Sequence, residues 1–249
     1  MLLGGGAAVN GDTMRQLAPT GKLRVALVLA PEKSVFFVVK DVDGRLDGVT
    51  ADIAAALANK LNLSIEYLLF ANSGLATDAI ESGAVDVSFM PVDEERKRRV
   101  AFGPNYVLGE STYMVTAALP AKTVADVDRP GVRVGIANTT TIRAAARTLK
   151  NTRIVPVASV AEAVTMLREG QADAFALSRD SLPSYAKQVP GSYITEGAFQ
   201  QIGIAIAVAK GKPESLAAVT EFMDAAKREG IVRKARDHAG YADIAVATQ

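Results

Sequence analysis

Residues 81–89 have the sequence ESGAVDVSF, and residues 168–176 have the sequence REGQADAFA. In both segments a serine or an acidic residue precedes a glycine, two residues follow, and an aspartate opens an apolar stretch. A glycine commonly ends a helix, and a short apolar run of this kind is typical of a buried strand. The chain therefore repeats one helix-to-strand unit, which predicts two α/β lobes of related build.

The sequence before the first copy alternates strand and helix signals. An apolar run with β-branched residues precedes a segment with helical spacing, and the pattern then recurs. Thr50 can cap the first helix, and Asn72 and Ser73 can cap the second. Strands are expected at residues 23–30, 65–70 and 85–89, and helices at 48–62 and 72–80.

A second series surrounds the second copy. Ser159 and Glu162 have the spacing of a capping box at the start of one of its helices. Strands are expected at residues 132–137, 172–177 and 201–209, and helices at 139–150, 159–167 and 213–230, with a short last helix near Ala235. The series predicts an open α/β sheet in each lobe.

Two apolar segments, STYMVTAAL at 111–119 and IGIAIAV at 202–208, separate the two series and are the natural crossovers. Two strands that both run between lobes would form a hinge. The expected division is a flexible segment at 1–22, a first lobe of 23–112 plus 204–249, and a second lobe of 113–203.

Composition excludes several classes of function. The 249 residues include 28 Lys+Arg and 27 Asp+Glu, so a net charge of +1 creates no overall field for nucleic acid. The sequence has no cysteine and one histidine, which excludes cysteine-based and two-histidine metal motifs. The one histidine, His238, is expected on the surface. Hydrolase, nucleotide-phosphate and dinucleotide motifs are absent, so we predict no catalytic residue, cofactor or metal.

The chain shows no apolar run of about 20 residues for a membrane span. The opening MLLGGGAAVN has no basic segment and too short an apolar stretch for a signal peptide. The sequence as given is expected to be soluble.

The densest charge run is DEERKRR at 93–99, and most of it fits a solvated helical face. Asp93 with Lys97, Glu94 with Arg98, and Glu95 with Arg99 are acid-before-base pairs at i,i+4. Arg96 has no partner at that spacing, although Asp93 could pair with it at i,i+3. It follows the carboxyl end of a strand, where it could hold a carboxylate through two hydrogen bonds.

The segment NTTT at 138–141 lies between a strand and a helix. Its threonines cap the helix, and the same N–H and hydroxyl groups could stabilise an anion. Arg96 and NTTT belong to different lobes, so a solute could be held from both sides of a cleft. Near Arg96, Phe89 and Met90 offer apolar contact or simply core packing, and Pro91 cannot donate a backbone hydrogen bond.

These segments together resemble the periplasmic solute-binding proteins of ABC transporters, of the polar amino-acid type. The similarity runs from Leu23 to about Gly240. It implies two α/β lobes joined by two hinge strands, a solute closed between them, a monomer, a permease partner and a periplasmic location. Its most specific segments are DGRLDGVTADIAAALANKL, AIESGAVDVSFMPVDEERKRRVAFGPNY, VRVGIANTTT and GQADAFALS.

The resemblance gives expected roles to individual residues. Arg96 matches the residue that holds the solute's α-carboxylate, and Thr139 and Thr140 match second-lobe donors. Asn138 stands where the family usually has Gly, and Pro91 stands where it often has Ser or Thr. The expected ligand-binding set is Ser34, Phe36, Asn72, Phe89, Met90, Pro91, Arg96, Asn138, Thr139, Thr140 and Ser178.

Ser178 replaces the family's aspartate that takes the solute's ammonium group, and Ser34 stands about where an aromatic residue is often found. Burying an ammonium without a carboxylate is costly, so we expect a small organic acid or amino-acid-like solute rather than an ordinary α-amino acid. Asp180 could substitute only if its side chain turned toward the cleft.

Two other functions fit the same resemblance. An enzyme similar to cyclohexadienyl dehydratase would need an acidic group facing the solute, for which Asp180 or Glu110 are available. A signalling sensor domain of this fold would usually precede a membrane helix. We expect the binding protein.

Overall fold

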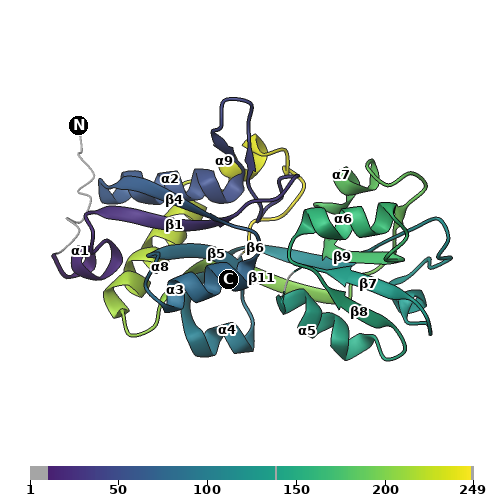
Figure 1. Cartoon of the computed structure of the whole chain (residues 1–249). Helices are drawn as coiled ribbons and strands as arrows, with labels where there is room; N and C mark the ends of the chain where they lie inside the picture. The colour runs from purple at the N-terminus through teal and green to yellow at the C-terminus, as the bar shows by residue number, and fades with distance from the viewer. Residues whose placement is uncertain (1–10, 138, 248–249) are drawn as a thin grey trace.

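The computed structural model describes residues 11–137 and 139–247. Figure 1 shows two α/β lobes, with strands β6 and β11 running through the region between them. Nine strands form one sheet in the order β4-β1-β5-β11-β6-β9-β7-β8, and β10 pairs with β6. The two-lobed α/β architecture predicted from the repeated unit is confirmed.

Three parallel strands form the centre of the first lobe: β1 (Lys22–Val28), β4 (Ser64–Phe70) and β5 (Val87–Pro91). All five residues of β5 are buried, as expected for a strand covered on both faces. The remaining elements are α1 (Gly11–Leu17), β2 (Val39–Lys40), β3 (Leu46–Asp47), α2 (Val49–Leu61), α3 (Ser73–Glu81), α4 (Glu94–Arg99), α8 (Pro213–Arg228) and α9 (Ile231–His238).

Helix α2 begins differently from the prediction. Thr50 was expected to cap it, but the helix starts at Val49 after Gly48, and no side chain caps it. Gly48 has a φ of 151°, and a Cβ atom there would lie 2.9 Å from the carbonyl oxygen of Phe37. Glycine at this position therefore lets the chain pass close to the loop before β2.

The second lobe repeats the arrangement. Strand β7 (Arg133–Ile136) pairs in parallel with both β8 (Arg153–Pro156) and β9 (Ala174–Ser178). Ser159 accepts a hydrogen bond from the N–H of Glu162, as the capping box predicted. The other elements are η1 (Val124–Val127), α5 (Thr139–Thr148), α6 (Val160–Arg168), α7 (Leu182–Ala186) and β10 (Tyr193–Ile194).

The repeated aspartate makes the same contact in each lobe. Asp86 accepts hydrogen bonds from the N–H and guanidinium of Arg24, in the neighbouring strand β1. Asp173 accepts the same set from Arg133, in the neighbouring strand β7. The repeat seen in the sequence therefore ties two parallel strands together at the same point of both lobes.

The long strands β6 (Val100–Val115) and β11 (Gln200–Ala209) are antiparallel and connect the lobes. The first crossover was expected from Ser111 onward, but Ser111–Val115 pairs with β9 and so already lies in the second lobe. Residues 200–204 of β11 pair with 107–111 of β6, next to shifts in register after Ile204. Between the lobes the sheet is thus reduced to two irregular strands.

The chain before β1 is more ordered than expected. Residues 1–22 were expected to be flexible, but residues 11–17 form α1, and Leu17 is buried in the core of the first lobe. Gln16 accepts a hydrogen bond from the N–H of Glu214 at the start of α8. Burial of Leu17 and this contact hold the helix in place, whereas residues 1–10 lie outside the described residues.

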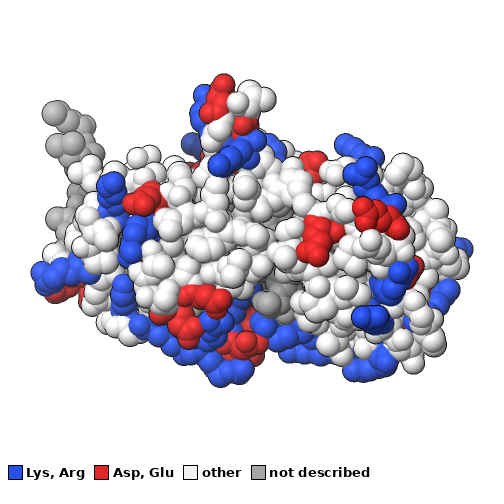
Figure 2. All heavy atoms as spheres, viewed as in Figure 1, with Lys and Arg blue, Asp and Glu red and all other residues white. Residues whose placement is uncertain are grey.

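Within the ranges 11–137 and 139–247, no helix is both long and apolar enough to span a membrane. Acidic and basic side chains are interspersed along the edges of both lobes in Figure 2, while the middle of this face is largely uncharged. A charged solute would therefore be recognised by local groups, as the net charge predicts.

Candidate functional site

Arg96 lies in the short helix α4, directly after β5, and is 2% exposed. Its guanidinium donates to the carbonyl oxygen of Pro91 at 3.1 Å and to the hydroxyl of Ser73 at 2.7 Å. Burial lowers the pKa of Arg96 to about 10, although the nearby charge of Asp93 opposes this effect. The first lobe thus holds a guanidinium away from water beside the start of α3.

Within the part of the chain that the structure describes, the three i,i+4 ion pairs expected along the charge run are not found. Asp93 precedes the helix and caps it, accepting from the N–H of Arg96 at 2.8 Å. Lys97 pairs with Glu94 at i,i+3, and Arg99 pairs with Asp78 and Glu81 of α3. Neighbouring helices supply partners that spacing along one helix cannot reveal.

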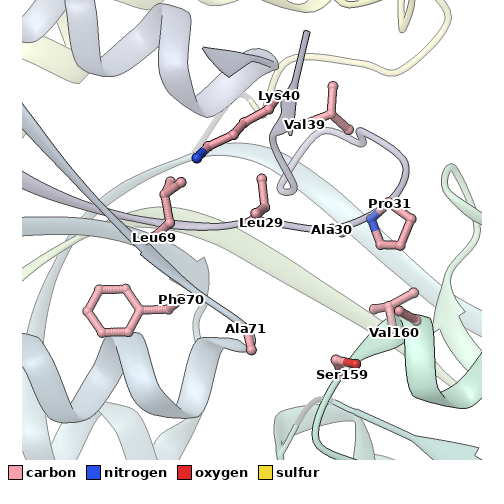
Figure 3. Close-up of a pocket in the computed structure, with 11 residues that line it drawn as sticks. Leu29, Ala30, Pro31, Val39, Lys40, Leu69, Phe70, Ala71, Ser159 and Val160 are labelled. Carbon is pink, nitrogen blue, oxygen red and sulfur yellow. The ribbon is translucent and has the colours of Figure 1, made fainter. Parts of the chain in front are cut away.

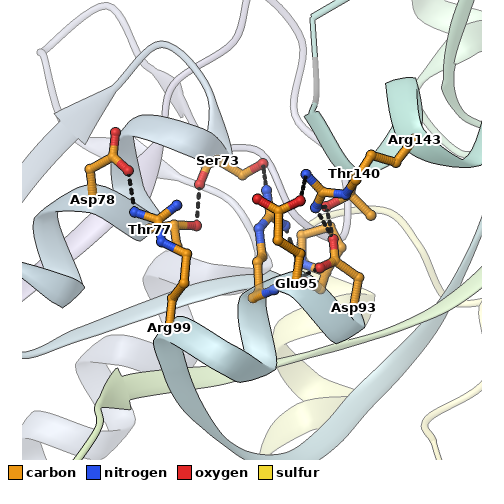
Figure 4. Close-up of polar contacts among 10 residues, drawn as sticks. Ser73, Thr77, Asp78, Asp93, Glu95, Arg99, Thr140 and Arg143 are labelled. Carbon is orange, nitrogen blue, oxygen red and sulfur yellow. Dashed lines mark hydrogen bonds and ion pairs between the residues drawn. The ribbon is translucent and has the colours of Figure 1, made fainter.

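The carboxylate of Asp93 reaches across to the second lobe. Its second oxygen accepts from the hydroxyl of Thr140 and from the guanidinium of Arg143, both in α5. Arg143 also pairs with Glu95 at 2.6 Å. Figure 4 shows these four side chains meeting between α4 and α5. Burial tends to raise the pKa of Asp93, but the hydrogen bonds from Thr140, Arg96 and Arg143 lower it overall.

Next to Thr140 is a small cavity of about 30 Å³. It brings together four of the residues expected from the sequence. These are Phe36, Pro91, Thr140 and Ser178, beside Thr141 and residues of the crossing strands. The two lobes are therefore closed upon each other at this point.

Four other expected residues have different surroundings. Phe89 and Met90 are buried in the core, where Phe89 packs edge-on against Tyr106. Ser34 is also buried, and its hydroxyl accepts from the N–H groups of Phe36 and of the residue after it. Asn72 caps α3 and donates across the lobes to the carbonyl oxygen of Ala158 at 3.3 Å.

Two further residues, Asn138 and Thr139, were expected at the start of helix α5. Asn138 lies outside the described residues. Thr139 is the first residue of α5, and only its backbone is described. Of the two expected threonines, Thr140 is therefore the one whose side-chain contacts are described.

The structure gives Asp180 a role of its own. Its carboxylate accepts from the N–H of Val35 at 3.0 Å and lines a separate pocket of about 650 Å³ with Tyr241. Burial raises the pKa of Asp180, opposed by hydrogen bonds that include one from Ser178. Ser178 also bonds to the hydroxyl of Ser181 at 2.7 Å. Asp180 thus joins the two lobes through the loop before β2.

Glu110, the other acid considered for catalysis, lies in strand β6 beside the small cavity. It forms an ion pair with Arg179 at 3.1 Å. Among the described residues no group of three or more His, Cys, Asp or Glu side chains is arranged to hold a metal ion.

A larger pocket, of about 500 Å³, lies along the same interlobe boundary and was not predicted. Figure 3 shows it between the ends of β1 and β4 and the start of α6, with the Lys40 amine above Leu69. Ala71 lines this pocket, Asn72 bridges the lobes, and Ser73 binds Arg96. Three consecutive residues therefore connect the pocket to the guanidinium.

Ser73 itself was missed as a site residue. Its place after the helix cap Asn72 suggested only a role at the start of α3. A hydroxyl at the carboxyl edge of the sheet, facing the same edge as Arg96, is the signal that could have found it.

The chain is similar to known solute-binding proteins. Residues 28–239 match the family described as bacterial extracellular solute-binding proteins, family 3. A glutamine-binding protein of Geobacillus stearothermophilus is 24% identical over 204 residues, covering 80% of this chain and 77% of that protein.

Solved structures agree on the fold. An ancestral arginine-binding protein bound to arginine is 28% identical with a TM-score of 0.77, covering 87% of this chain and 97% of the other. An ancestral amino-acid-binding protein described as a precursor of cyclohexadienyl dehydratase is 27% identical with a TM-score of 0.78, covering 90% and 98%. The similarity extends through both lobes.

Proposed function

Because the chain belongs to the bacterial extracellular solute-binding proteins of family 3, we propose that it captures a small carboxylate-bearing solute between its lobes. It then delivers this solute to the permease of an ABC transporter. The protein works as a monomer in the periplasm or an equivalent space outside the cytoplasm. The glutamine-binding and arginine-binding relatives support solute capture in general.

The observation that carries this proposal is the carboxylate of Asp93. That group is held by the Arg96 N–H from the first lobe and by Thr140 and Arg143 from the second. The interlobe boundary therefore has donors suited to a carboxylate, and the buried guanidinium of Arg96 adds a fixed positive charge beside them. A solute carboxylate has the same chemistry as the side chain that these donors hold here.

The solute we propose is an organic acid without an α-ammonium group. Ser178 offers a neutral hydroxyl where the family has a carboxylate, and Asp180 is turned toward Val35. An ammonium closed between the lobes would lose its hydration without a paired charge, which is costly.

We propose binding rather than catalysis. The Glu110 carboxylate is paired with Arg179, and the Asp180 carboxylate is held by the Val35 N–H. A general acid must reach the bond that breaks with a proton to give. Glu110 lines the same cavity as Thr140, but its carboxylate is engaged by the Arg179 guanidinium, and Asp180 is turned toward Val35.

Native mass spectrometry of the protein purified without added solute tests the proposal. We expect an added mass that is released on denaturation and corresponds to a small organic acid. A thermal-shift panel of 2-oxo, hydroxy and simple carboxylic acids should then raise the melting temperature, because these solutes bind the folded state. A protein that carries no acid and whose melting temperature responds to no carboxylate would contradict the proposal.

A further inference from the structure

Asp93 connects two elements that belong to different lobes. One oxygen of its carboxylate caps α4, and the other accepts from Thr140 and Arg143 of α5. Because the cap fixes the side chain on the first lobe, the second oxygen is held toward the second lobe. The contact can form only when the lobes are closed.

Charge is balanced around this contact. Asp93 and Glu95 face Arg143 and the nearby Arg96, giving two acids and two bases. The side chain of Asp93 is 16% exposed and that of Arg143 is 33% exposed, so water screens the pair only in part. A solute carboxylate that entered would add a third negative charge and would need the donors that Asp93 already uses.

Other contacts across the lobes are of a different kind. Asn72 donates to a carbonyl oxygen, and Gln188 donates to Glu32 at 3.0 Å. Each of these has at least one neutral partner, whereas Arg143 and its partners Asp93 and Glu95 all carry full charges. Charge-assisted hydrogen bonds are shorter and stronger than neutral ones, so the contacts of Arg143 with Asp93 and Glu95 have the largest effect on closure per contact.

We infer that Asp93 is a built-in substitute for the solute's carboxylate: it holds the lobes closed without solute and competes with the solute for Thr140 and Arg143. The competition rests on the proposed function, whereas the closure does not. Asp93 thereby sets the affinity threshold for carboxylates. Only a solute whose other contacts outweigh the loss of this internal pair can bind.

The test replaces Asp93 by Asn, which keeps a good helix cap but removes the charge. Because the sequence has no cysteine, spin labels can be attached at Lys60→Cys and Lys150→Cys alone. Double electron–electron resonance then measures one distance between the two lobes. Without solute, we expect a longer and broader distance distribution in Asp93→Asn than in the parent. Glu94→Gln, which alters an exposed pair within α4, is the matched control and should leave the distribution unchanged.

Arg143→Gln tests the contact from the other side and covers the case that Asp93→Asn folds poorly. It also removes the pair with Glu95, so it should lengthen the distance at least as much. The double variant should add little to Arg143→Gln alone, because both changes remove the Asp93–Arg143 interaction. An unchanged distance in both single variants, or fully additive effects, would overturn the closure.

Competition is measured with acetate as the probe, by calorimetry. Asp93→Asn should bind acetate about tenfold more tightly than the parent, since the donors no longer hold an internal carboxylate. Equal or weaker acetate binding by Asp93→Asn would overturn the competition. The distance measurement uses no solute, so its outcome is independent of whether the protein proves to bind carboxylates at all.

Discussion

Arg96 shows how a single residue can be recognised in a charge run. It lacks an i,i+4 partner in the sequence, and in the structure it is the residue of α4 that turns into the protein. Its exposed neighbours Glu94 and Lys97 pair with each other instead. The absence of an i,i+4 partner therefore distinguished Arg96, which is buried, from its exposed neighbours in the same helix.

Replacing Arg96 by Ala should weaken binding of the solute acid by roughly 2 to 5 kcal/mol, because the carboxylate loses a buried charge partner. Calorimetry with the acid identified by mass spectrometry measures the effect. Arg98→Ala, an exposed position in the same helix, is the matched control and should change the affinity little. A loss of less than about tenfold in Arg96→Ala would remove Arg96 from the site.

Ser178 stands where the family has the aspartate that binds the solute's ammonium group. Introducing Ser178→Asp should shift the preference from organic acids toward α-amino acids, since an ammonium would then meet a carboxylate. A thermal-shift comparison of the two solute classes in the parent and the variant gives the answer. If the unmodified protein already responds more to lysine, arginine, glutamine or glutamate than to every organic acid, the argument from Ser178 is wrong.

The arginine–aspartate contact that joins two parallel strands occurs in both lobes, as Arg24–Asp86 and as Arg133–Asp173, so its contribution to stability can be measured at two degrees of burial. The side chain of Asp86 is fully buried, whereas that of Asp173 is 29% exposed. Asp86→Asn should therefore lower the free energy of unfolding by about 3 kcal/mol, as expected for a broken buried pair. Asp173→Asn should cost about 1 kcal/mol because solvent screens its partner. Thermal denaturation of both variants measures the difference, and equal losses would contradict the dependence on burial.

The effect of Asp173 should also depend on pH. The hydrogen bond from Arg133 lowers the pKa of Asp173 in the folded protein, and burial opposes this only in part. The stabilisation is then present above the unfolded pKa of about 3.9 and is lost as the pH falls through the folded pKa. The difference in melting temperature between the parent and Asp173→Asn should be largest near neutral pH and shrink below about pH 4. A difference that grows on acidification would exclude this carboxylate as its source.

The whole molecule moves, in our proposal, about the two strands between the lobes. Residues 107–111 and 200–204 pair there with irregular register nearby. Arg96 and Thr140 lie on opposite sides, so a solute that contacts both favours the closed form. Closure would also change the outer surface presented to a permease.

Small-angle scattering with and without the identified acid tests this motion. Saturating solute should reduce the radius of gyration, slightly in the parent, where Asp93 already favours closure, and more in Asp93→Asn. Arg96→Ala serves as the control and should show no reduction at the same solute concentration. An unchanged radius in Asp93→Asn, once binding is shown, would exclude hinge closure.

The two-lobed plan and most of its longer strands and helices could be predicted from the sequence, because they follow from local terms, whereas short elements such as β8 were not predicted. Apolar runs mark the strands of both lobes, and the glycine before each repeated aspartate marks a helix end. Arg96 and Thr140 could be singled out as candidates for the same reason, since their positions after a strand and before a helix are local features, and their role toward a solute stays a prediction.

Contacts between distant residues were settled only by the tertiary structure. Asp93 and Thr140 are 47 positions apart, and their meeting depends on how two lobes close, which no spacing along the chain encodes. For the same reason Arg99 pairs with α3 rather than along α4, and Leu17 orders a segment expected to be flexible. Local preference fixes each element, whereas the packing of elements selects which charges meet.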